Sequence, residues 1–483
     1  MRVNDIVILG GGASGTIAGL ILKNRYPQIN ITIIMSEKIG TIGVGEGITE
    51  HWQNFADYLE LNPFDVIKKC GATYKAGLKF VNWGEEDFMH SLHSAWAMHR
   101  TGYLFRFGHL ISNNAPKKDL TPHWIWDNET TLNFYNEQTN VPVQQFHFDA
   151  NKLNTYLLDI CADRGINLVI DDIIDIELTE SGDVAKLISD FSSYAADFFI
   201  DASGFKRYLL HQKLGVEWKS YKEYLPVNKA FAFETEEMEE YNMFTTITAQ
   251  KNGWNWKTPV QGRTGNGYVY NDQFVSDEDA IKEMESFYGR KLKVNKFFKF
   301  DSGRLNKSWY KNTLAIGLSS NFIEPLEASS LGTVIQQVFC FMDFLPSWDD
   351  ESYNKNMEDV FDNSLDFIRT HYLTKREDSE FWKYVKYELK MPDSLNKLLS
   401  QWKKRLPNNS DIYGNWNLFH IANYIQVLYG LDWFDVEKIK EEYEYFPYKD
   451  VIGEDIAARI YEERRLPRMG HKDIIKAICE CVP

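Results

Sequence analysis

Two uninterrupted apolar runs flank a glycine-rich turn in the first 35 residues. Residues 6–9 (IVIL) and 31–35 (ITIIM) have no polar interruption beyond one threonine, whereas residues 13–22 combine small and apolar residues at helical spacing. Strands that are apolar on both faces suit a parallel sheet covered by helices. The pattern therefore predicts a βαβ unit over residues 5–35.

The pattern changes twice further along the chain. Residues from about 80 to 300 mix aromatic-rich strand patterns with turns, and residues 194–204 (YAADFFIDASG) within them predict a buried strand that returns to the first sheet. After about residue 335 the pattern is helical, with charged amphipathic stretches such as residues 436–445. No linker or repeat separates these regions, so we expect them to pack as one body.

Composition and charge limit the classes of function. The chain has 483 residues, 44% hydrophobic and 25% charged, which is typical of a globular protein. Its net charge of -16 repels phosphate backbones, so nucleic acid is not expected as a partner. The five cysteines are scattered, the first apolar run is too short for a signal peptide, and none is long enough for a membrane span. We expect a reduced, cytoplasmic protein with no membrane partner and no metal site.

Residues 10–15 (GGGASG) match G-x-G-x-x-G between the first strand and the first helix. Gly10 allows the tight turn, Gly12 lets the backbone approach a pyrophosphate, and Gly15 lets the helix pack on the strand. The helix N-terminus offers free N–H groups to phosphates, whereas the simpler alternative is a glycine-rich surface turn. The predicted dinucleotide contacts are Gly10, Gly12, Ala13, Ser14 and Gly15.

Three other positions bear on which dinucleotide binds. Met35 stands where the ribose-binding acid usually ends the second strand, so Glu37 is the candidate replacement. Residues 197–205 (DFFIDASGF), with Asp201, resemble the late FAD motif of glutathione-reductase-type flavoproteins. Residues 314–317 (LAIG) resemble the strand before a further flavin contact at Gly317. FAD is therefore favoured over NAD.

These resemblances imply an α/β fold with a Rossmann-like FAD-binding domain of the glutathione-reductase or para-hydroxybenzoate-hydroxylase type. We expect residues 1–340 to form this core, with a mixed-sheet substrate region inserted at about 80–300, and residues 341–483 to form a helical region packed on it. Only one G-x-G-x-x-G is present, which indicates that a separate reductase supplies the reduced flavin.

Four segments carry a more specific resemblance. Residues 253–259 (GWNWKTP) match the signature G-W-x-W-x-I-P except at Thr258, residues 74–83 (YKAGLKFVNW) contain a lysine at the second position, and residues 321–327 (NFIEPLE) contain E-P-L-E. Together with residues 43–47 (GVGEG), they resemble the flavin-dependent halogenases typified by the tryptophan halogenases.

The resemblance implies that FADH2, O2 and a halide (chloride, bromide or iodide) give hypohalous acid, which Lys75 receives. Glu327 is implied to assist electrophilic halogenation of an aromatic substrate, either as a base or by stabilising the cationic ring. Ser329 and Ser330 follow Glu327 and are implied to bind the halide through their backbone N–H groups. The further flavin contacts that we expect are Glu37, Gly43, Val44, Gly45, Glu46, Asp201, Gly317 and Leu331.

Trp254, Trp256 and Pro259 are expected to separate the flavin from the organic substrate, an electron-rich indole- or phenol-like aromatic. The expected partners are that substrate and a separate flavin reductase, and a homodimer is left open. Each site residue has a simpler interpretation: Lys75 as a solvated surface lysine, Glu327 as a carboxylate at a helix N-terminus, and the tryptophans as core. Five histidines of the aromatic-rich region are expected to be structural, although one could line the substrate pocket: His90, His93, His109, His123 and His147.

Two other functions remain open at this point. A flavin monooxygenase that hydroxylates an aromatic would share the FAD scaffold, but direct oxygen transfer needs neither Lys75 nor the tryptophan pair. A flavin-binding partner subunit without catalysis would not need to retain Lys75 and Glu327 together.

Overall fold

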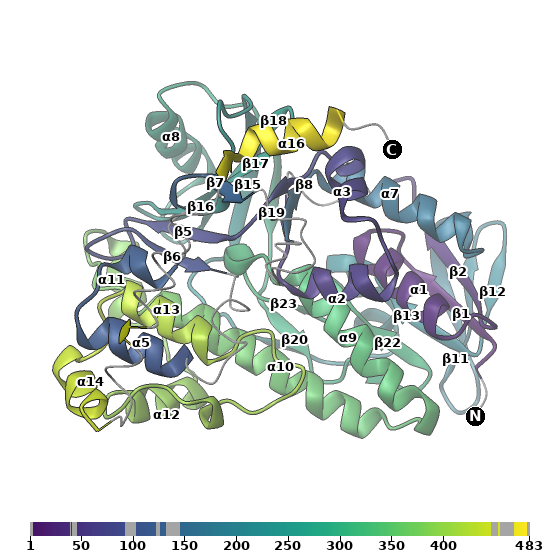
Figure 1. Cartoon of the computed structure of the whole chain (residues 1–483). Helices are drawn as coiled ribbons and strands as arrows, with labels where there is room; N and C mark the ends of the chain where they lie inside the picture. The colour runs from purple at the N-terminus through teal and green to yellow at the C-terminus, as the bar shows by residue number, and fades with distance from the viewer. Residues whose placement is uncertain are drawn as a thin grey trace.

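The structure is a computed structural model, in which two sheets and a group of helices surround a common core (Figure 1). It describes residues 3–38, 40, 46–91, 103–121, 126–131, 145–445, 453–454 and 468–480.

The first sheet has six strands in the order β21-β22-β13-β1-β2-β9. Its centre is parallel, because β1 pairs in parallel with both β2 and β13. Helix α1 follows β1 directly and is buried along most of its length against this sheet. The bounds are β1 Asp5–Leu9, α1 Ala13–Arg25, β2 Asn30–Met35, β9 Asn167–Ile170, β13 Phe198–Asp201, β21 Trp309–Tyr310 and β22 Thr313–Ala315.

These bounds confirm the predicted βαβ unit and the predicted return of a buried strand, which is shorter than expected. Only residues 198–201 join the first sheet, because residues 193–195 form the edge of a separate antiparallel sheet. That sheet consists of β10 Ile173–Leu178, β11 Val184–Ser189 and β12 Ser193–Ala195.

The second large sheet has seven strands in the order β19-β15-β18-β17-β16-β5-β6. All of its pairs are antiparallel except the pair of β16 with β5. Within the segment from 80 to 300 that was expected to form this region, β9 and β13 join the first sheet instead. The segment therefore contributes to both large sheets. The bounds are β5 Gly77–Val81, β6 Phe88–Ser91, β15 Lys229–Thr235, β16 Phe244–Ala249, β17 Gly253–Val260, β18 Arg263–Tyr270 and β19 Val294–Lys299.

Three small sheets join these layers. They comprise β3 Glu46–Gly47, β8 Phe146–Phe148 and β4 Thr73–Tyr74; β14 Trp218–Ser220, β20 Gly303–Leu305 and β23 Asn321–Phe322; and β7 Glu129–Thr131 with β24 Arg468–Gly470.

The described chain after residue 330 is mainly helical, as its amphipathic pattern predicts, and α11 to α14 lie at the left of Figure 1, whereas α16 lies at the top. They are α9 Ser330–Phe344, α10 Asp350–His371, α11 Glu380–Tyr387, α12 Asp393–Trp402, α13 Ile421–Gly430, α14 Val436–Tyr443 and α16 His471–Glu480. The earlier helices are α2 His51–Tyr58, α3 Pro63–Cys70, α5 Tyr103–Ser112, α7 Ala150–Asp163 and α8 Asp277–Tyr288. Among the described residues, no helix combines the length and apolarity that a membrane crossing requires.

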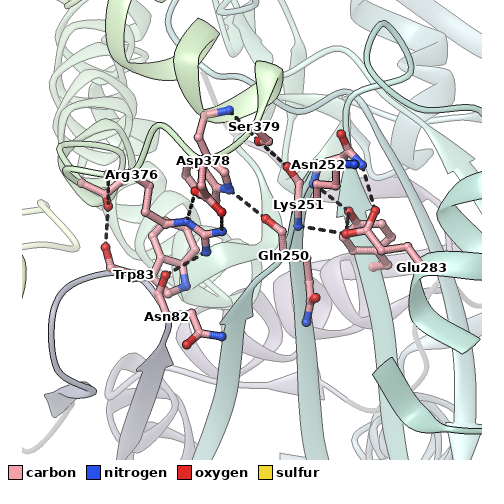
Figure 2. Close-up of polar contacts among 12 residues, drawn as sticks. Asn82, Trp83, Gln250, Lys251, Asn252, Glu283, Arg376, Asp378 and Ser379 are labelled. Atoms are coloured by element: carbon pink, nitrogen blue, oxygen red, sulfur yellow. Dashed lines mark hydrogen bonds and ion pairs between the residues drawn. The ribbon is translucent and has the colours of Figure 1, made fainter. Parts of the chain in front are cut away.

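The connection from α10 to α11 forms hydrogen bonds with two separate parts of the second sheet, the end of β5 and the β16–β17 turn (Figure 2). Arg376 donates from Nη1 to the carbonyl of Asn82, just beyond β5, at 2.9 Å. Ser379 donates from Oγ to the carbonyl of Lys251, in the turn between β16 and β17, at 2.6 Å. The C-terminal end of α10 is thereby held over the sheet between these two points.

Candidate active site

Lys75 lies between β4 and β5, and its side chain is fully buried. Backbone hydrogen bonds hold the chain on either side, from Lys75 N to the Gln145 carbonyl at 2.8 Å and from Ala76 N to the Met243 carbonyl at 2.6 Å. The Nζ atom has no hydrogen-bond partner among the described residues. It lies over Gly47, where an added Cβ would approach Nζ to 2.7 Å. The interpretation of Lys75 as a solvated surface lysine is therefore wrong.

Burial lowers the pKa of Lys75 to about 8, because the low-dielectric interior disfavours the charged ammonium. The carboxylates of Glu327 and Glu50 oppose this effect but only in part. An amine with such a pKa has a substantial neutral fraction near physiological pH, and the neutral form is the nucleophile.

Glu327 ends a short 3-10 turn, Pro325–Glu327, and its carboxylate is fully buried. It accepts hydrogen bonds from His90 Nδ1, at 2.9 and 3.0 Å, and from His371 Nε2 at 2.7 Å. Burial alone would raise its pKa, but the charge and hydrogen bonds of these histidines outweigh burial and hold the pKa at about 2. Since the carboxylate is engaged by imidazoles, the interpretation of Glu327 as a carboxylate serving only a helix N-terminus is wrong.

The neighbouring polar groups determine which ring nitrogens of His90 and His371 carry a proton. The Asn423 carboxamide accepts from the His420 backbone N–H at 2.6 Å, so its NH2 group faces His90 Nε2 at 2.9 Å. His90 Nδ1 therefore carries the proton that is donated to Glu327. His371 Nδ1 faces the carbonyl of Phe367 at 2.9 Å, which can only accept, and its Nε2 faces the ionised Glu327. Each imidazole therefore directs a protonated nitrogen at the Glu327 carboxylate.

Helix α9 begins directly after this carboxylate. Ala328 adopts a left-handed conformation with φ of 52°, which is uncommon for a residue other than glycine and reverses the chain direction. Ser329 is the N-cap residue, and in the described part of the chain no side chain caps the first turn. The N–H groups of Ser330 and Leu331 therefore stay available to an anion. Ser330 is exposed, whereas Ser329 and Leu331 are buried.

The glycine fingerprint has the shape that a dinucleotide requires. An added Cβ on Gly12 would meet nothing within 4 Å, so the backbone borders open space where α1 begins. An added Cβ on Gly15 would lie 1.9 Å from the Gly10 carbonyl, which shows how closely strand and helix pack. Gly317 lies against Ser14 at the same helix end. These residues fit FAD, since the uncapped first turn of α1 and the open approach over Gly12 suit a pyrophosphate.

Other expected flavin contacts differ in their surroundings. Asp201 is fully buried, and its carboxylate accepts from Ser203 and from the backbone N–H groups of Leu209 and Leu210. It therefore shapes the end of β13, and its binding to FAD stays a prediction. Glu37 is exposed in the turn after β2. Glu46 belongs to β3 and pairs with Phe148, whereas Gly43, Val44 and Gly45 lie outside the described residues, as do His93 and His123.

The two tryptophans of the predicted barrier lie on one face of β17. Their ring centroids are 6.3 Å apart and their planes are inclined by 59°. Trp254 is fully buried and donates from Nε1 to the hydroxyl of Tyr372 at 3.0 Å. Trp256 lies on Gly267 of β18, where any Cβ would overlap its ring. Pro259, at the end of the motif, accepts from Thr73 Oγ1 at 2.8 Å, which joins this strand to the segment that precedes Lys75.

Sequence reasoning missed the residues that hold this site from the C-terminal region. His371 and Tyr372 are adjacent at the end of α10, and they bind Glu327 and Glu324 respectively. Asn423, from α13, orients His90. One signal was present in the sequence: six of the last nine residues of α10 are polar, although all nine are buried.

Comparison with known proteins identifies the family. A family model of tryptophan halogenases matches residues 5–438. The chain belongs to the tryptophan halogenase family. Its matched relatives are flavin-dependent oxidoreductases, so the chain is a flavin-dependent halogenase by family, as its motifs predict.

One relative, the 7-chloro-L-tryptophan 6-halogenase KtzR of Kutzneria sp., is 29% identical over 88% of this chain and 90% of its own length. The tryptophan 6-halogenase SttH of Streptomyces toxytricini is 28% identical over 88% and 89%.

Solved structures of the family superpose over nearly the whole chain. Tar14, a tryptophan C-6 flavin-dependent halogenase from taromycin biosynthesis, matches with a TM-score of 0.88 and 27% identity, covering 99% of this chain and 100% of its own. The crystal structure of SttH matches with a TM-score of 0.88, 26% identity and coverage of 99% and 100%. The predicted Rossmann-like FAD-binding fold is thereby confirmed.

Proposed function

We propose that the protein halogenates an electron-rich aromatic substrate, and that the Lys75 amine carries the halogen to it. The observation that supports this proposal most strongly is the fully buried Lys75 Nζ atom, which has no partner among the described residues. An unpaired buried amine is costly, so it is retained where it does chemistry.

Reduced FAD, when bound with O2 and a halide, supplies hypohalous acid. Gly12 and the first turn of α1 would hold the FAD pyrophosphate, and the first turn of α9, at Ser329 and Ser330, would hold the halide. Because the chain has one glycine fingerprint, a separate reductase would supply the reduced flavin.

Lys75 then acts as a nucleophile. Its neutral amine attacks the halogen, the nitrogen–halogen bond forms as the halogen–oxygen bond breaks, and the released hydroxide takes the proton from nitrogen to leave as water. A carbon of the aromatic ring next takes the halogen from nitrogen, and the proton lost from that carbon restores the amine.

Glu327 is better suited to stabilise charge than to remove the ring proton. A carboxylate whose pKa is about 2 is a weak base, but it stays ionised while the ring carries positive charge. The substrate class is an indole or a phenol, and tryptophan is one candidate because the relatives KtzR and SttH are named for it.

The test compares Lys75→Ala with Lys79→Ala. Lys79 lies on β5 four residues away, and it forms an ion pair with Asp87 at 3.0 Å. With reduced FAD, O2 and bromide, K75A should lose at least about 100-fold in product, on the scale of losing an essential catalytic group, while still binding FAD. K79A should stay close to the wild type. Equal product from K75A and the wild type would refute the role of the amine, and a hydroxylated product formed without halide would indicate a monooxygenase.

A further inference from the structure

Trp254 is held by a hydrogen-bond chain that runs in one direction only. An indole N–H can only donate, so the Tyr372 oxygen accepts it, at 3.0 Å. The hydroxyl proton of Tyr372 must then be donated elsewhere, and it goes to Glu324 Oε1. All three side chains are almost completely buried, so no bulk water competes for these bonds.

We propose that Tyr372 and Glu324 are positioning residues that fix the orientation of the Trp254 ring, and through it the barrier between the flavin and the aromatic substrate. This inference rests on the proposed function for the role of the barrier, but the hydrogen-bond chain itself does not. Neither Tyr372 nor Glu324 contacts the reacting atoms in the proposed mechanism.

The packing around the chain explains why a hydrogen bond is needed. Trp254 touches Trp256 at an inclined angle, and Trp256 fills the space over Gly267, so a rotation of the first ring displaces the second. Ring packing restrains the indole through its shape, and the N–H bond adds a directional contact at one edge. Tyr372 is itself fixed because its ring packs against Trp83, with centroids 5.6 Å apart.

Glu324 acts in this chain as a neutral acceptor. Burial raises its pKa to about 8, more than the Tyr372 hydrogen bond and the Arg369 charge lower it, so the protonated form predominates at neutral pH. Its Oε2 atom has no partner in the part of the chain that the structure describes. A glutamine has the same shape and also accepts from Tyr372, so Glu324→Gln is the conservative replacement, whereas Glu324→Leu removes the acceptor.

The first experiment needs neither flavin nor turnover. In enzyme labelled with 15N at tryptophan, the Trp254 indole N–H resonance is assigned by its loss in Trp254→Phe. In Tyr372→Phe this resonance should shift and its hydrogen exchange should accelerate about fivefold or more, as expected for the loss of one hydrogen bond. Tyr221→Phe is the matched control, because Tyr221 is also fully buried and bonds the α10 carboxylate of Asp362. An unchanged resonance in Y372F would overturn the proposal.

The second experiment measures halogenated product formed per O2 consumed. This ratio should fall about fivefold in Y372F and in E324L, and E324Q should restore it close to the wild-type ratio. In a Trp254→Phe background, Y372F should cause no further loss, because both changes act on the same ring. Additive losses, or equal ratios in E324Q and E324L, would refute the positioning role. If the wild type makes no halogenated product at all, the proposed function fails, whereas the resonance still decides the hydrogen-bond chain.

Discussion

Glu324 and Glu327 stand three residues apart in one turn, both almost completely buried, yet their protonation is opposite. The pKa of Glu324 is raised to about 8 and that of Glu327 is lowered to about 2. Burial raises the pKa of both, so the difference comes from their partners: Glu324 receives one tyrosine hydroxyl, whereas Glu327 receives two imidazole N–H groups. Sequence spacing and burial therefore do not determine the charge of a carboxyl group, and the donors that face it do.

The two glutamates consequently serve different parts of the site. The ionised Glu327 acts on Lys75 and favours its ammonium form, while Glu324 stays neutral in the hydrogen-bond chain to Trp254. His371 and Tyr372, which are adjacent at the C-terminal end of α10, each contact one of the two glutamates, so one helix end reaches both groups.

The largest effect on the rate of halogenation is expected when the ionised glutamate, Glu327, is neutralised. Glu327→Gln should reduce the rate of aromatic halogenation about 100-fold, because it removes the charge that stabilises the cationic ring. Hypohalous acid formation, measured with a halide acceptor such as monochlorodimedone, should fall much less. Glu324→Gln is the matched control and should retain most of the rate. An equal loss of both reactions in E327Q would contradict the assigned role.

An intermediate effect is expected when Glu327 loses one donor. His371→Gln removes one of the two imidazoles that lower the pKa of Glu327, so this pKa should rise and halogenation should fall about tenfold, which is the scale of a hydrogen bond to a charged group. The pH–rate profile should shift with it, because part of the carboxylate becomes protonated in the acid range. His109→Gln, which removes a histidine bound to Tyr443 away from the site, provides the control. An unchanged profile in H371Q would show that His90 alone sets the charge.

The smallest effect on turnover, but a clear one on stability, is expected from Glu324→Gln. The folded protein keeps a proton on Glu324 that the unfolded chain releases above pH 4.5, so wild-type stability falls as the pH rises from about 4.5 to about 8. Glutamine cannot ionise, so the Tm of E324Q should exceed that of the wild type by an increasing margin across this window. Thermal unfolding at several pH values checks this.

E327Q should show the opposite sign. The low pKa of Glu327 gives stability that is present above pH 4.5 and is lost as the pH falls to about 2. E327Q should therefore be less stable than the wild type at neutral pH, and the difference should shrink in acid. Parallel curves for E324Q and E327Q would mean that the two carboxyl groups are not differently protonated.

The sequence was sufficient to predict features that depend on residues close together in the chain. The βαβ unit and the turn at Gly12 follow from short patterns, and Lys75 and Glu327 were singled out as candidates from motifs within about ten residues. The partners of these residues could not be predicted in this way, because Glu327 meets His90 across 237 positions and Trp254 meets Tyr372 across 118. Those contacts arise only when distant segments of the chain pack together. The histidine that sequence reasoning took as structural, His90, binds the proposed catalytic carboxylate.

The connection that holds α10 over the sheet uses main-chain acceptors. Arg376 and Ser379 bind carbonyl oxygens, not side chains, at Asn82 and Lys251. Every amino acid supplies such an oxygen, so the side chains at positions 82 and 251 take no part in these two bonds. Thr374 and Trp382 also donate to carbonyl oxygens beside these two points, at Trp83 and Gln250. The spacing between β5 and the β16–β17 turn is thus set by four side-chain donors, and the sheet contributes only its backbone to these bonds.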